Sequence, residues 1–99
     1  MLNNVILVGR ISSLPTAEEV GIVTKFTLAT SRSYKNTEGL YETDFIPIVV
    51  GGENMAKSLT DYCKVGDMVG VKGRIETTPL NEIKIIADRL TFLSSKKDD

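Results

Sequence analysis

The chain has 99 residues, of which 41% are hydrophobic and 25% are charged, and its formal net charge is −1 with a sequence pI of about 5.4. These values are typical of one globular domain and argue against a protein that binds nucleic acid through bulk positive charge. With no histidine, one cysteine and no apolar run of roughly 18–20 residues, we expect a cytoplasmic, non-enzymatic protein without metal, cofactor or membrane span.

The N-terminal third predicts two strands joined by a loop. Residues 3–11 form a nearly unbroken apolar run, typical of a curved strand that turns a corner at Gly9, and they lack the basic n-region of a signal peptide. Residues 12–19 predict the loop. Residues 20–31 predict the second strand, because apolar and polar side chains alternate on its two faces around Phe26.

A polar hairpin is expected to join the second strand to the third. Residues 33–42 are mostly polar, and residues 36–39, with the sequence Asn-Thr-Glu-Gly, are a turn signal. The third strand is predicted over residues 43–50. Pro47 within it lacks an amide hydrogen, which indicates that the strand is an edge or is bulged at this point.

A helix is predicted over residues 53–63. Gly52 or Asn54 is the expected N-cap. Gly66 is expected to take the left-handed conformation that ends a helix. One apolar stripe runs along the predicted helix and contains Met55, Leu59, Tyr62 and Cys63.

Two further strands are predicted over residues 68–77 and 82–93, with a short turn at residues 79–81. Three strands, a helix and two strands in this order predict an all-β fold, a five-stranded Greek-key barrel of the oligonucleotide-binding type (OB-fold). We expect the domain to span residues 1–94 and residues 95–99 to form a short polar tail. The aromatic residues assigned to its core are Phe26, Tyr62 and Phe92.

Three aromatic residues in and beside the hairpin are candidates for contact with nucleic-acid bases: Tyr34, Tyr41 and Phe45. Rings on a curved sheet offer flat apolar platforms for unstacked bases, worth roughly 1–3 kcal/mol per base. Alternatively, Phe45 belongs to the core and the tyrosines only cover the end of the sheet.

Basic side chains near these rings are candidates for phosphate contacts. Arg32 and Lys35 flank the first tyrosine of the hairpin, and Lys25 lies on the polar face of the same hairpin. Lys72 and Arg74 share one face of the fourth predicted strand. On spacing alone, solvated surface explains the hairpin set better, since the chain has 12 basic residues, and it explains the Lys72 and Arg74 pair equally well.

In these segments the chain resembles the bacterial single-stranded DNA-binding protein family, in a short form without the acidic C-terminal tail. The segments that carry the resemblance are residues 4–10, 26–30, 43–50, 59–66 and 69–75. The resemblance implies an OB-fold that binds single-stranded DNA without strong sequence preference during replication, recombination or repair. It also implies a homo-oligomer, with a tetramer favoured over a dimer.

The resemblance also implies roles for individual residues. Tyr34 stands where the family usually has a stacking tryptophan, Phe45 takes another stacking position, and Thr27 matches a DNA-facing threonine. Lys35 and Lys64 match basic positions. Pattern and resemblance together predict nine nucleic-acid-binding residues: Lys25, Thr27, Arg32, Tyr34, Lys35, Phe45, Lys64, Lys72 and Arg74.

The chain departs from the family at several places. Two further stacking aromatics would fall near Gly51 and Leu80, where this chain has none, and their loss removes about 2–6 kcal/mol of gross binding per protomer. The hairpin between the last two strands is short. We therefore expect weaker binding or a smaller footprint. Replication and repair proteins stay candidate partners, although the acidic tail tip that they read is absent.

Two other functions stay open. An OB-type protein-interaction module, similar to the primosomal replication-restart proteins, fits the missing aromatics and the acidic pI. An enzyme such as a nuclease is disfavoured by the absence of histidine and of carboxylates with metal-ligand spacing.

Overall fold

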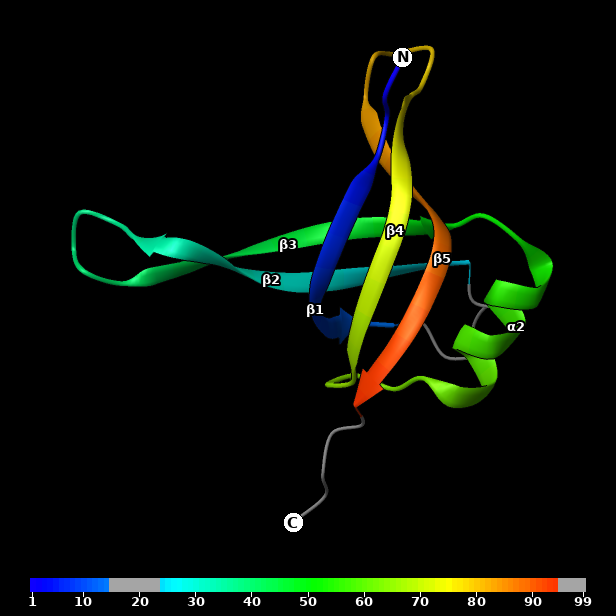
Figure 1. Cartoon of the computed structure of the whole chain (residues 1–99), viewed down its shortest axis with the longest axis horizontal. Coiled ribbons are helices and arrows are strands. Elements are labelled where there is room, and N and C mark those ends of the chain that lie inside the picture. The colour runs from blue at the N-terminus through cyan, green and yellow to red at the C-terminus, as the bar shows by residue number, and fades with distance from the viewer. Residues whose placement is uncertain (15–23, 95–99) are drawn as a thin grey trace.

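The computed structural model describes residues 1–14 and 24–94 (Figure 1). The strands of this part form a closed barrel in the order β1-β2-β3-β5-β4, and one helix connects β3 to β4. The predicted five-stranded barrel is confirmed. The elements are β1 (Val5–Ser13), β2 (Lys25–Lys35), β3 (Tyr41–Val50), α2 (Glu53–Tyr62), β4 (Met68–Thr77) and β5 (Ile83–Ser94).

The first strand turns the corner of the barrel close to the predicted glycine. β1 pairs with β4 through residues 5–10 and with β2 from Arg10 onward, so it changes partner at that residue. Gly9 is buried there, and a Cβ atom on it would lie 2.3 Å from the carbonyl oxygen of Ala29. A side chain at Gly9 would therefore force the two strands apart.

The barrel closes through a short parallel contact between β3 and β5. Three register pairs join residues 48–50 to residues 85–87, whereas the other described strand pairs are antiparallel. The Gly51 amide extends this contact by donating to the Ala87 carbonyl at 3.0 Å. Pro47 lies just before it, where β3 is paired with β2 but not yet with β5, so the predicted edge position is confirmed.

The core consists of inward-facing apolar side chains from the strands and from one face of the helix. Phe26 is 3% exposed, as predicted, and Leu28, Ile48 and Leu59 are fully buried. Burial of each such side chain contributes about 1.5–3 kcal/mol relative to leaving it in water. The helix packs against the barrel through Leu59 and Ala56, and this face fixes where α2 lies.

The helix boundaries differ slightly from the prediction. Gly52 is the N-cap, one of the two residues expected, and α2 ends at Tyr62 with Cys63 in an extended conformation. Gly66 has the predicted left-handed conformation, with φ of 99°. Because the helix has already ended, this glycine shapes the turn before β4 instead of terminating the helix.

Two of the three aromatic residues assigned to the core lie on the surface, so that prediction was wrong for both. Tyr62 is 77% exposed and Phe92 is 50% exposed. Tyr62 is the last residue of the helix, at the margin of the buried stripe. Phe92 pairs with Val69 and lies two residues before the end of β5. Both rings line an open hollow of about 350 Å³ at this end of the barrel.

Strand ends account for the other differences. β1 runs two residues later at both ends than predicted, and β2 continues to Lys35, through residues assigned to a loop. β4 has the predicted bounds. Part of the predicted loop at residues 12–19, the start of the predicted second strand and the tail at residues 95–99 lie outside the described residues.

Candidate nucleic-acid interface

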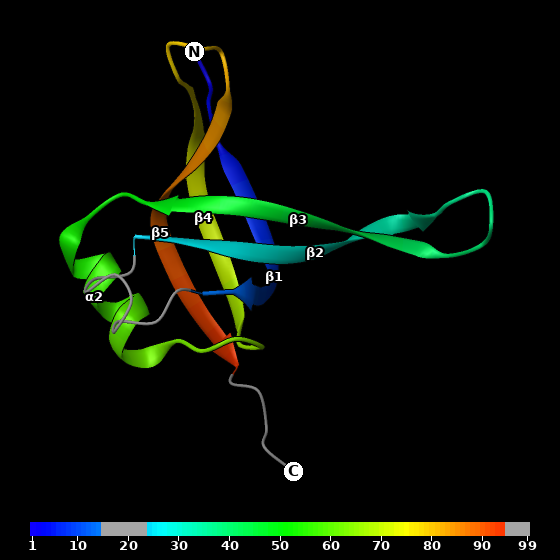
Figure 2. The same cartoon turned by 180° about the vertical axis from the view of Figure 1, so that it is seen from behind.

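The extension of β2 and β3 produces a hairpin that projects away from the barrel, on the side opposite α2 (Figures 1 and 2). The two strands stay paired as far as Lys35 and Tyr41. The turn is closed by the Asn36 amide, which donates to the Leu40 carbonyl at 2.8 Å, and Gly39 has φ of 81°. The predicted hairpin turn is confirmed.

Three aromatic rings are exposed on this hairpin and its base. Phe45 is 65% exposed, Tyr34 is 63% exposed and Tyr41 is 59% exposed. The alternative that Phe45 belongs to the core is therefore wrong. Unpaired bases can stack on exposed aromatic rings of this kind.

One of these rings already has a cation on its face. The Lys35 Nζ atom lies 5.7 Å from the centroid of the Tyr41 ring, within the range of a cation–π interaction. This contact holds a positive charge beside an aromatic surface. The pair thus combines an aromatic surface, on which bases stack, with a positive charge, which attracts phosphates.

Alternation along β2 and β3 brings three of the predicted residues to one outer surface. Phe26 and its inward neighbours face the core, so Lys25 and Thr27 face outward on β2. Phe45 faces outward on β3 opposite Ala29, two register pairs from Thr27. A hydroxyl, an ammonium group and an aromatic ring therefore share the outer face of the β2–β3 sheet.

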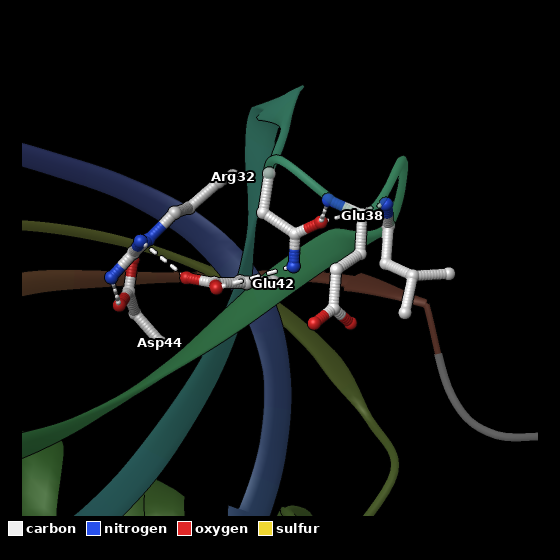
Figure 3. A network of polar contacts seen from close by, with 6 residues as sticks. Arg32, Glu38, Glu42 and Asp44 are labelled. Atoms are coloured by element: carbon white, nitrogen blue, oxygen red, sulfur yellow. Dashed lines mark hydrogen bonds and ion pairs between the residues drawn. The ribbon is translucent and has the colours of Figure 1, made fainter.

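Arg32 lies on the hairpin, but its guanidinium is bound to carboxylates (Figure 3). Its Nε and Nη2 atoms donate to the two oxygens of Asp44 at 3.1 and 2.9 Å, and its Nη1 atom donates to Glu42 at 2.5 Å. The hydrogen bond from Arg32 lowers the pKa of the Asp44 carboxyl below its ordinary value, and Asp44 raises the pKa of Arg32. Two negative charges thus balance this cation.

Arg74 is paired in the same way on β4. Its Nε atom donates to Glu76 at 2.8 Å, and its Nη1 atom contacts Asp88 on β5. The hydrogen bond to Glu76 is the main cause of the raised pKa of Arg74. Lys72, two residues earlier, is exposed and lies opposite Ile6 of β1.

The predicted residues fall into separate groups on the molecule. Figure 1 shows β1, β4 and β5 in front of β2 and β3, and Figure 2 shows the reverse. Outward side chains of the two layers point in opposite directions, so Lys72 and Arg74 do not share a surface with Phe45. Lys64 is exposed in the connection from α2 to β4, close to the end of β1, to which Gly66 is bonded.

Sequence reasoning missed the acidic partners of both arginines. Arg32, Asp44 and Glu42 occupy alternate positions on two facing strands, and this signal is readable once the register of the hairpin is known. It also missed two large apolar side chains on the outer face of β1: Ile6 is 75% exposed and Val8 is 58% exposed.

The profile of a family described as the single-strand binding protein family matches residues 2–90. The chain belongs to this family. Among curated relatives in the single-strand binding protein family, "Single-stranded DNA-binding protein 3" of Listeria innocua is 37% identical over 99% of this chain and 68% of its own length. "Single-stranded DNA-binding protein 1" of Clostridium acetobutylicum is 29% identical over 98% of both chains.

Solved structures show the same fold at lower identity. The yeast mitochondrial single-stranded DNA-binding protein Rim1 has a TM-score of 0.74 and 18% identity, covering 97% of this chain and 99% of its own. A Plasmodium falciparum SSB in complex with ssDNA has a TM-score of 0.71 and 24% identity, covering 95% and 96%. The fold found by structural comparison therefore agrees with the family match.

The described residues contain neither a cluster of metal ligands nor a membrane-spanning helix. In residues 1–14 and 24–94, no three acidic, cysteine or histidine side chains are grouped as metal ligands. Within the same ranges, α2 is neither long nor apolar enough to cross a membrane, and no other helix there does so.

Proposed function

We propose that this protein binds single-stranded DNA without catalysis, and protects and presents the unpaired strand in replication, recombination or repair. The observation that carries the proposal is the set of three exposed rings on the β2–β3 hairpin and its base, Tyr34, Tyr41 and Phe45. Relatives that are 34–37% identical are named as single-stranded DNA-binding proteins, which supports it.

The bound strand would follow the outer face of β2 and β3 toward the hairpin. Stacking on the rings is tolerant of sequence, because every base has an aromatic face. Lys25 and Lys35 would supply the phosphate contacts on this path. Lys72 would take part only where the strand passes round the barrel to the β1–β4–β5 layer.

The proposal includes assembly as a homotetramer through the outer face of β1. Ile6 and Val8 expose apolar surface side by side with Lys72 on β4, and burial against a second copy would remove this surface from water. Light scattering at micromolar concentration should give about four times the monomer mass of 10.8 kDa. A mass of 10.8 kDa would contradict assembly, and a mass of twice that value would indicate a dimer.

A titration with poly(dT) tests the DNA-binding proposal. The chain has three tyrosines and no tryptophan, and two of the three, Tyr34 and Tyr41, lie on the hairpin, so a change in tyrosine emission on binding is expected to come mainly from these two rings. We expect saturable quenching that weakens as salt is raised, with log K falling by about 0.7 per phosphate contact and per decade of salt. Duplex DNA is the control. Absence of any response at low salt would refute the proposal.

A protein-interaction module is the second candidate, and the hollow between Tyr62 and Phe92 favours it. The two rings are exposed beside Met68 and Leu93 at the end of the barrel, away from the hairpin. Exposed apolar groups of this kind are typical of protein contacts. Absence of binding to poly(dT) at low salt would support this function instead.

A further inference from the structure

A continuous series of polar contacts begins at the tip of the hairpin. The Asn36 side-chain oxygen accepts hydrogen bonds from the backbone amides of Glu38 and Leu40, at 2.9 and 3.0 Å. Its Nδ2 atom donates to the Glu42 carboxylate at 3.3 Å (Figure 3). The turn is thereby tied to the strand that leaves it.

The same carboxylate continues the series toward the barrel. The second oxygen of Glu42 accepts from Arg32, and the opposite edge of that guanidinium is held by both oxygens of Asp44. Asp44 pairs with Thr30 in the regular part of the β2–β3 ladder. Arg32 therefore joins the turn, through Glu42, to the ordered base of the hairpin.

This series crosses the one stretch of the β2–β3 ladder where backbone pairing is irregular. The register shifts between Ser31 and Lys35, and the residues between them have no ladder partner in the described pairs. Tyr34 lies in this stretch, two residues after Arg32, and both side chains line an open hollow of about 400 Å³ together with Glu42. The side-chain contacts of Arg32 thus span the irregular stretch that contains Tyr34.

We propose that Arg32 is a positioning residue: by binding Glu42 and Asp44 together, it fixes the irregular part of the hairpin and holds the Tyr34 ring ready to stack on a base. This inference rests on the proposed DNA-binding function. It gives Arg32 a role other than the expected phosphate contact. A ring held in place loses less conformational freedom on binding, which improves affinity without a new contact. A cation balanced by two carboxylates has little charge left for a phosphate.

A double-mutant cycle separates the two roles of Arg32. Oligo(dT) affinity is measured across a salt series for the unmodified protein, Arg32→Gln, Tyr34→Ala and the double variant. We expect Arg32→Gln to weaken binding about five- to tenfold with an unchanged salt slope, and to have no further effect in the Tyr34→Ala background. Additive losses, with a slope reduced by about 0.7, would overturn the proposal in favour of a phosphate ligand.

Two further variants control for charge. Lys57→Gln removes one positive charge from the exposed side of α2, and it should leave affinity unchanged. Glu42→Gln removes a negative charge near the proposed path of the DNA. A purely electrostatic role for this residue predicts tighter binding, whereas the positioning role predicts weaker binding because the series of contacts is cut. Tighter binding by Glu42→Gln would count against the proposal.

Hydrogen exchange distinguishes failure of this inference from failure of the proposed function. In the Arg32→Gln variant, the amides of residues 32–42 should exchange faster while those of the barrel core keep their protection. Unchanged exchange in the hairpin would overturn the positioning role. If the unmodified protein fails to bind oligo(dT), the proposed function is refuted, and this measurement still tests whether Arg32 orders the hairpin.

Discussion

Phe45 on β3 lies directly opposite Ala29 on β2, and this small neighbour leaves the aromatic ring 65% exposed. Three residues along the same strand, Ile48 faces Phe26, which is 3% exposed. One antiparallel pair of strands thus directs one phenylalanine into the barrel and presents the other to solvent. The first contributes to stability and the second is available to a ligand.

Replacement of Phe45 by leucine tests the stacking role directly. Leucine keeps an apolar side chain at the surface but removes the flat ring, so oligo(dT) binding should weaken by about 1–3 kcal/mol. The melting temperature should hardly change, because the ring is not part of the core. Fluorescence titration and thermal unfolding give the two quantities. A large fall in melting temperature would show that the ring stabilises the fold instead.

Glu76→Gln tests whether bound DNA reaches β4. Arg74 loses one of its two carboxylate partners in this variant and keeps Asp88. If the strand passes over this layer, the salt slope of binding should steepen by up to about 0.7, because the partly freed guanidinium can contact a phosphate. Asp61→Asn, the same charge change on the exposed side of α2, is the control. An equal slope in all three proteins would place the DNA path on β2 and β3 alone.

The two sides of α2 should respond differently to truncation. Leu59 is fully buried, so Leu59→Ala should lower the free energy of unfolding by about 2–5 kcal/mol. Tyr62→Ala should change it by no more than about 0.5 kcal/mol, because the tyrosine ring is 77% exposed. Urea unfolding of both variants measures the contrast. A comparable loss in Tyr62→Ala would mean that the ring packs against the barrel in solution.

Cys63 should be chemically inert near neutral pH. Burial, with a smaller contribution from the Asp67 charge, raises the pKa of its thiol from 9.0 to about 11. At pH 8 about one thiol in a thousand is then the reactive thiolate. Iodoacetamide should modify the folded protein far more slowly than the urea-unfolded chain.

The same shift links stability to alkaline pH. The folded state holds the thiol proton more tightly than the unfolded chain, so its stabilising contribution is complete below pH 9 and is lost as pH rises through about 11. A Cys63→Ala variant should lack this part of the alkaline decline. Equal declines in both proteins would show that other groups cause it.

Much of the fold follows from local patterns that barrel formation does not override. β4 has the predicted bounds because Val69 and Val71 alternate with outward residues and a turn glycine precedes the strand. Phe26, assigned to the core, and Leu59, assigned to the apolar stripe of the helix, are both buried, because each lies within an element where the apolar period is clear.

The rest of the fold depends on contacts between residues on different elements, which a local sequence pattern does not contain. β2 continues beyond its predicted end because cross-strand bonds from Arg32 hold two polar segments together, and polarity alone favoured a loop. Tyr62 is the last residue of α2 and Phe92 lies two residues before the end of β5, and both rings are exposed although their spacing is that of core residues. The positions of the predicted site residues are known, and their contacts with DNA stay predictions.

The junction after β3 limits how this chain can be engineered toward higher affinity. A Cβ atom on Gly51 would lie 2.7 Å from the Ala87 carbonyl oxygen, the same atom that accepts the Gly51 amide hydrogen. A tryptophan at this position would therefore clash with the contact between β3 and β5 that closes the barrel. Leu80, at an open turn and 81% exposed, has room for an indole. An additional stacking ring should therefore be introduced first at Leu80.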